Sequence, residues 1–157
     1  MSKLIIIISF ILDIILSNLL PYWKNSLSLF TPLFVPLTIY LIYPYYKTNK
    51  KYLREVFITG LLYDLFMTNL LFFNSFIFLI LGIITISIYK KFKIDFKSNI
   101  IFSIIIIIIY EITEVIIFNI SKMTIISLKE LIYYIIHSIL INLVYAEIVF
   151  NMKKINV

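Results

Sequence analysis

The chain has 157 residues, 62% of them hydrophobic, and a formal net charge of +6 at pH 7. It contains no cysteine, which excludes disulfides, iron–sulfur clusters and cysteine-ligated metals, and its two glycines are too few for a phosphate-binding loop. In a soluble protein this charge would suggest nucleic-acid binding, but here short basic loops separate apolar runs of about 20 residues. We therefore expect residues 1–157 to form one integral membrane domain.

The apolar runs predict six membrane-spanning helices. A spanning helix needs about 20 mostly apolar residues to cross about 30 Å of hydrocarbon. Residues 53–89 are too many for one crossing, because 37 residues extend about 55 Å at 1.5 Å per residue, so we expect a turn near residues 67–75. Pro36 falls inside the second run and is expected to kink it. The prediction is an all-α bundle of six transmembrane helices with approximate bounds 4–20, 29–46, 53–71, 75–89, 99–119 and 131–150.

Basic residues are distributed unequally between the two sets of loops. With both termini on one side, eleven of the 14 Lys and Arg residues fall on that side, and Lys24, Lys122 and Lys129 fall on the other. Short cytoplasmic loops of membrane proteins carry an excess of Lys and Arg. We therefore expect a multi-pass protein with both termini in the cytoplasm.

Several ionisable side chains lie inside the predicted spans, where each is energetically costly and a candidate functional group. Their depths place Glu114 and His137 at a similar level, which predicts a buried pair between the fifth and sixth spans. Such groups most often form polar contacts that position helices, and the alternative is a proton relay or a ligand site. The ionisable residues are Asp13, Asp64, Glu111, Glu114, His137 and Glu147.

Two further patterns predict helix packing. Gly60 and Asp64 are four residues apart and share one helix face. The glycine would let a neighbouring backbone approach closely, and the aspartate would form a hydrogen bond across that contact. In the sixth span polar residues recur at spacings of four, four and three, and this stripe should face the bundle interior or a partner helix: Tyr134, Ser138, Asn142 and Tyr145.

Groups able to carry out catalysis are scarce. The chain has one histidine, and Glu111 and Glu114 share a helix face without the further ligands that a metal site requires. We therefore expect neither an enzyme nor a bound cofactor or metal.

Residues 29–89 carry a more specific pattern. Thr31-Pro32-Leu33 opens the second span, a basic loop follows, and the third span contains Gly60-Leu61-Leu62-Tyr63-Asp64. A proline at the start of the second span and a Gly-Leu-x-x-Asp motif in the third resemble the MreD family of bacterial rod shape-determining proteins. Two places differ from the family pattern. Thr31 stands where many relatives have arginine, and Phe72-Phe73-Asn74-Ser75 stands where many have a glycine.

The resemblance implies a non-enzymatic scaffold of the cell-wall elongation machinery in the bacterial cytoplasmic membrane. It implies a fold similar to the six-helix substrate-binding components of energy-coupling-factor vitamin transporters. The implied partners are a single-span MreC-like protein, MreB filaments, the synthase RodA and a class B penicillin-binding transpeptidase. The candidate residues for helix packing or partner binding are Pro32, Gly60, Asp64, Asp13, Glu114, His137 and Asn142.

Two other functions stay open at this point. A vitamin-binding transporter component would share the fold, but such components dock through small-residue patterns such as Ala-x-x-x-Ala in the first span. This chain has Ser9, Asp13 and Ser17 there and no alanine. An ion or proton transporter is suggested by the intramembrane carboxylates alone.

Overall fold

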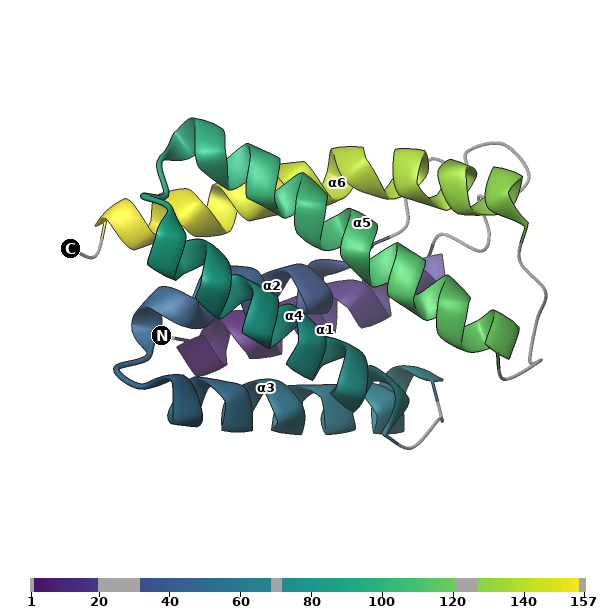
Figure 1. The fold of residues 1–157 in the computed structure, drawn as a ribbon, viewed down its shortest axis with the longest axis horizontal. Coiled ribbons are helices and arrows are strands. Elements are labelled where there is room, and N and C mark those ends of the chain that lie inside the picture. The colour runs from purple at the N-terminus through teal and green to yellow at the C-terminus, as the bar shows by residue number, and fades with distance from the viewer. Residues whose placement is uncertain (1, 20–31, 69–71, 121–126, 156–157) are drawn as a thin grey trace.

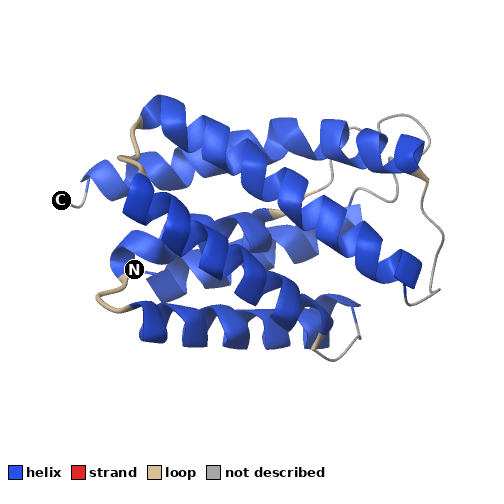
Figure 2. Cartoon of the chain, in the orientation of Figure 1, coloured by secondary structure: helices blue, strands red, loops and turns tan. Residues whose placement is uncertain are grey.

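The chain is helical throughout the part that the structure, a computed structural model, describes: residues 2–19, 32–68, 72–120 and 127–155 (Figure 2). A 3-10 turn, η2 (Tyr43–Tyr45), extends the second α-helix, and a π-helical turn, η3 (Asp64–Thr68), extends the third. The predicted all-α class and the six helices are confirmed over these residues. The helices are α1 (Ser2–Leu19), α2 (Phe34–Ile42), α3 (Asn49–Tyr63), α4 (Phe73–Lys91), α5 (Phe96–Ile120) and α6 (Leu128–Ile155).

Long apolar helices make the chain a multi-pass membrane protein. Among the described residues, three helical segments are long and apolar enough to cross a bilayer: Phe73–Lys91, Phe96–Ile117 and Leu128–Met152. Phe34–Tyr45 is a shorter apolar helix.

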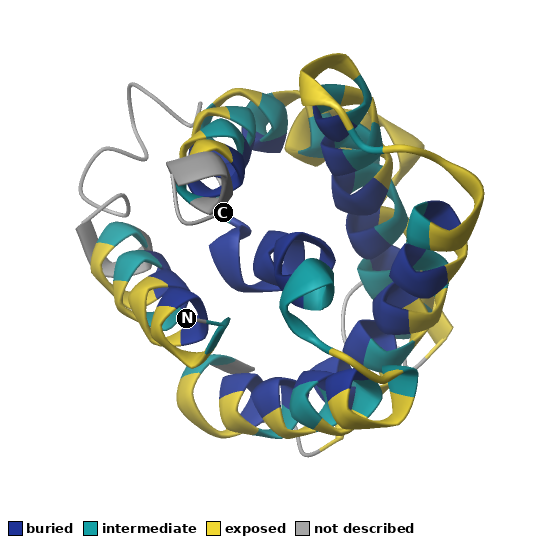
Figure 3. Ribbon diagram, turned by 90° about the vertical axis from the view of Figure 1, so that its left-hand side faces the viewer, coloured by how far each residue is buried: buried dark blue, intermediate teal, exposed yellow. Residues whose placement is uncertain are grey.

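The helix α2 lies at the centre of the bundle, and the other five helices surround it (Figure 3). All nine residues of α2 are buried. Each surrounding helix turns apolar side chains outward, among them Ile7, Ile58, Ile83, Ile116 and Ile136, with exposed fractions of 42% to 61%. An apolar outer surface of this extent is suited to contact with lipid.

The second helix begins later than predicted. The expected span was 29–46, whereas α2 starts at Phe34, and residues 29–31, like residues 20 and 69–71 of other predicted spans, lie outside the described part. Pro36 is therefore the third residue of its helix, where a backbone N–H has no intrahelical acceptor. The proline removes no helical hydrogen bond there, so the reason for the predicted kink does not apply.

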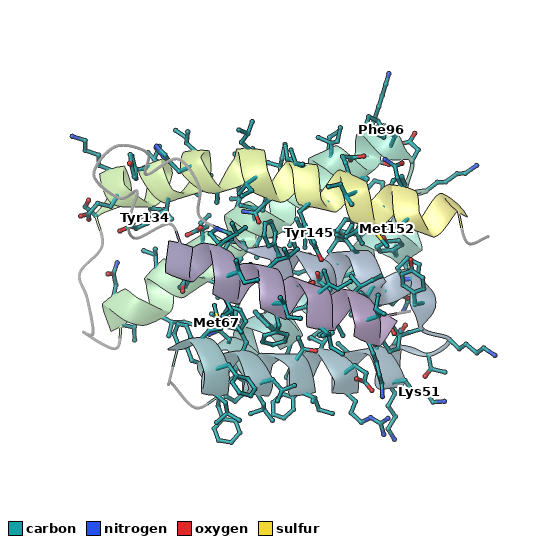
Figure 4. The ribbon with its side chains drawn as sticks, turned by 180° about the vertical axis from the view of Figure 1, so that it is seen from behind. Lys51, Met67, Phe96, Tyr134, Tyr145 and Met152 are labelled. Carbon is teal, nitrogen blue, oxygen red and sulfur yellow. The ribbon has the colours of Figure 1, made fainter. Side chains whose placement is uncertain are left out.

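The basic residues gather at one end of the bundle, which we call the basic end. The start of α1, the α2–α3 and α4–α5 connections and the end of α6 all lie there (Figure 1). Lys51, Phe96 and Met152 mark this end in Figure 4, and Met67 and Tyr134 lie at the opposite end. In the α4–α5 connection, hydrogen bonds from the side chain and backbone N–H of Ser98 lower the pKa of Asp95.

Candidate functional site

The carboxylate of Asp64 caps the N-terminus of a neighbouring helix. Asp64 is fully buried at the end of α3, and its Oδ1 accepts hydrogen bonds from the backbone N of Asn74 at 2.7 Å and from Asn74 Nδ2 at 3.0 Å. Its Oδ2 accepts from the backbone N of Ser75 at 3.1 Å and from Ser75 Oγ at 2.9 Å. Both amides belong to the first turn of α4, where backbone N–H groups have no intrahelical partner and a negative charge is favoured.

Gly60 makes this contact possible. A Cβ atom at position 60 would lie 2.5 Å from Ser75 Cα and 2.9 Å from Ser75 N, closer than real Cβ contacts. Only a glycine therefore allows α3 and α4 to approach until Asp64 reaches the amides of α4. The predicted roles of Gly60 and Asp64 are confirmed. Tyr110 of α5 donates to Asn74 Oδ1 at 3.0 Å, and together Asp64, Asn74, Ser75 and Tyr110 form the α4 cluster.

Asp13 caps α2 in the same way. Its Oδ1 accepts from the backbone N of Phe34 at 3.0 Å, and its Oδ2 accepts from the backbone N of Val35 at 2.9 Å. Asn142 of α6 contributes a third acceptor, because its Oδ1 receives the backbone N–H of Leu33 at 2.8 Å. The first turn of the central helix is thus held by side chains from α1 and α6.

Three hydroxyl groups join the same helices nearer the basic end. Ser9 Oγ lies 2.6 Å from Thr38 Oγ1 and 2.7 Å from the Tyr145 hydroxyl, and the Thr38 and Tyr145 oxygens lie 2.5 Å apart. Figure 4 shows Tyr145 in the middle of the bundle, where α6 passes α1. We call Ser9, Asp13, Thr38, Asn142 and Tyr145 the α2 cluster.

The sequence pointed to part of these clusters. The polar stripe on α6 faces inward at Ser138, Asn142 and Tyr145, which are buried, whereas Tyr134 is 38% exposed. Thr38 was missed, because a single threonine in an apolar run gives no periodic signal. Asn74 and Ser75 were assigned to a turn, although such residues at the start of an apolar helix are a typical helix-start signal.

The predicted pair of Glu114 and His137 is not formed. No hydrogen bond or ion pair joins these two described residues; instead, His137 Nδ1 lies 2.6 Å from the carbonyl oxygen of Tyr133 on its own helix. The imidazole also stacks on the Tyr133 ring, with centroids 3.7 Å apart. Equal depth in a bilayer places two residues in one layer, but it does not turn them toward each other.

Pro32 and the remaining carboxylates make no further site. Pro32 is partly buried and directly precedes Leu33, the N-cap residue of α2, so it lies beside the α2 cluster. Within the described ranges no three histidine, aspartate or glutamate side chains come together as a metal site would require. Comparison of the chain with protein-family models, with curated proteins and with solved structures gives no match.

Proposed function

We propose that this chain is an MreD-type scaffold, a non-enzymatic subunit of the machinery that elongates the bacterial cell wall. In this proposal all six helices cross the cytoplasmic membrane and the basic end faces the cytoplasm. The subunit binds a single-span MreC-like protein and so helps to connect MreB filaments with RodA and a class B transpeptidase.

The observation that carries the proposal is the geometry of Gly60 and Asp64. These two residues form the motif on which the family resemblance depends, and they make a specific contact between α3 and α4. A motif with a defined structural task is stronger support than a similarity of composition, because apolar composition is common to all membrane helices.

The backbone at Phe72 also supports the family assignment. Phe72 has φ of 66°, in the left-handed region that glycine adopts most easily. It lies several residues beyond Asp64, in the stretch where many family members have a glycine. The chain therefore differs from the family in residue type at this turn while its backbone takes the conformation that a glycine favours.

The buried carboxylates favour a scaffold over a transporter. Asp13 and Asp64 accept backbone hydrogen bonds from the starts of α2 and α4, so both are engaged in holding helices. Ser9 and Asp13, which lie on one face of α1, point at α2 and α6 and are not available for docking another protein. The outer surface is apolar, so recognition by this chain would take place mainly within the bilayer.

Two experiments test the proposal. Depletion of the protein from a rod-shaped or helical cell should make the cells round, and re-expression should restore their shape. The tagged full-length chain, solubilised in mild detergent, should co-purify with the MreC-like protein of the same cell. Cells that keep their shape after depletion, or a failure to co-purify, would contradict the proposed function.

A further inference from the structure

A second intramembrane polar contact lies between α5 and α6, near the basic end and away from both clusters. Asn99 Nδ2 donates to Glu147 Oε1 at 3.0 Å. The other oxygens of this pair, Asn99 Oδ1 and Glu147 Oε2, are buried and have no hydrogen-bond partner among the described residues. Ser103 Oγ, one helical turn beyond Asn99, is in the same condition. Buried polar atoms of native proteins nearly always have partners, so this group of oxygens indicates a missing donor.

These oxygens border a groove on the outer surface. The groove has a volume of about 390 Å³ and is lined by Ile100, Leu143, Val144, Glu147, Ile148 and Asn151. Val144 and Ile148 are 58% and 57% exposed, so the groove opens toward the surrounding lipid. Apart from Glu147 and Asn151 its lining is apolar. A carboxylate at the side of an apolar, lipid-facing groove is a poor lipid contact and a good contact for a helix that brings a donor.

We propose that this groove, the Glu147 groove, receives a transmembrane helix of a partner protein that carries a lysine or arginine near its cytoplasmic end. The basic group donates to Glu147 Oε2 and Asn99 Oδ1, and the apolar face of the same helix covers Val144 and Ile148. The inference rests on the proposed function, because it assigns the docking surface for the single-span partner.

Charge and depth both specify this occupant. An ionised carboxylate and an amide oxygen only accept hydrogen bonds, so the missing group must be a donor, and a cation complements the carboxylate best. Glu147 lies eight residues before the end of α6 at Ile155, which is about 12 Å along the helix. Single-span proteins with a cytoplasmic N-terminus carry basic residues at that end, and their long side chains can reach along a helix to this depth.

Cysteine cross-linking tests the position of the partner. The chain contains no cysteine, so each introduced thiol is unique. Full-length Val144→Cys and Ile148→Cys variants are co-expressed with the MreC-like protein carrying single cysteines through the cytoplasmic half of its span. Disulfide adducts are expected from both groove positions. Ile83→Cys on α4 is the matched control, because Ile83 is equally exposed at 56% and also lies eight residues from the basic end of its helix.

A charge-neutral substitution tests the chemistry. Glu147→Gln keeps an oxygen for Asn99 Nδ2 but removes the negative charge, and we expect at least about tenfold less co-purified partner, the effect of losing one hydrogen bond to a charged group. Replacement of the partner's basic residue by glutamine should have the same effect and add little to Glu147→Gln. Glu114→Gln, at an intramembrane glutamate outside the groove, should leave recovery of the partner unchanged. An unchanged melting temperature shows that each variant is folded.

The possible outcomes separate the docking surface from the proposed function. If the wild-type chain co-purifies with the partner but adducts form equally from Ile83→Cys, or Glu147→Gln retains the partner, the inference is wrong and the scaffold function stands. Loss of a bound aminophospholipid from Glu147→Gln, with the partner retained, would likewise assign the groove to lipid. If the partner does not bind the wild-type chain, both proposals fail.

Discussion

At the scale of single residues, two aspartates solve two energetic problems of the bilayer at once. A charged side chain at the centre of a membrane costs about 2.5–3.5 kcal/mol on insertion scales. A helix that begins inside the bundle leaves backbone N–H groups without water as an alternative partner. Asp13 and Asp64 place their carboxylates on such groups at the starts of α2 and α4. Each side chain therefore supplies what the other helix lacks.

The Asp64 contact predicts a graded response to substitution. Asp64→Ala should lower the free energy of unfolding by about 3–5 kcal/mol, because it leaves two buried backbone amides unpaired, each of which costs about 1–3 kcal/mol. Asp64→Asn retains one acceptor oxygen and should lose about half as much. Unfolding in detergent, followed by circular dichroism, measures both. Asp95→Asn in the exposed α4–α5 connection is the control, and an equal loss there would contradict the special role of Asp64.

Within the α2 cluster, the capping aspartate should matter more than the hydroxyl groups. Asp13→Ala removes the acceptor for the N–H groups of Phe34 and Val35 and should cost about 2–4 kcal/mol of stability. Tyr145→Phe should cost only about 0.5–1.5 kcal/mol, since Ser9 and Thr38 still bond to each other at 2.6 Å. The same unfolding assay compares them. A larger effect for Tyr145→Phe would show that the hydroxyl groups, and not the cap, hold α2.

At the scale of helices, the central position of α2 explains why so many side chains serve it. Its nine residues extend only about 14 Å, too short to cross the hydrocarbon alone. It is buried on all sides, so neither lipid nor water contacts its flanks. Its first turn is held by Asp13 and Asn142, and further along it Tyr52 of α3 donates to the carbonyl oxygen of Ile39 at 2.9 Å. The surrounding helices thus fix the position of α2 through hydrogen bonds as well as packing.

The two glycines differ in what surrounds them, which makes one a control for the other. Gly60→Ala should separate α3 from α4 and lower the free energy of unfolding by about 2–3 kcal/mol, because the added methyl group meets backbone atoms of Ser75. Gly82→Ala meets only side-chain atoms, with Leu53 Cδ2 nearest at 3.1 Å, and its effect should stay within about 1 kcal/mol of zero. Thermal unfolding of the two variants decides, and equal losses would contradict the close approach at Gly60.

At the scale of the whole molecule, charge and hydropathy give the bundle an orientation. The outer surface is apolar around its circumference, while the connections at the basic end carry most of the described Lys and Arg residues. A bilayer accepts the first feature, and the positive-inside tendency assigns the second to the cytoplasm.

Labelling of single cysteines tests this orientation. Cysteine at position 51 or 93, at the basic end, should react with a membrane-impermeant maleimide only after the cells are permeabilised. Cysteine at position 129, at the start of α6, should react in intact cells. The cysteine-free parent chain gives the background. The reverse pattern would mean that the basic end faces outward, and the proposed contact with cytoplasmic filaments would then be excluded.

The sequence by itself determined that this is a helical membrane protein, where its helices run, which end is basic, and that Gly60 and Asp64 serve a close helix contact. These properties are periodic or local along the chain, so residue spacing reveals them. Only the tertiary structure decided that α2 starts at Phe34 in the middle of the bundle, that Asp13 and Asn142 hold its first turn, and that Glu114 and His137 do not meet. Those facts depend on how each helix is rotated about its axis and on which helix lies beside it, and apolar runs specify depth without specifying rotation.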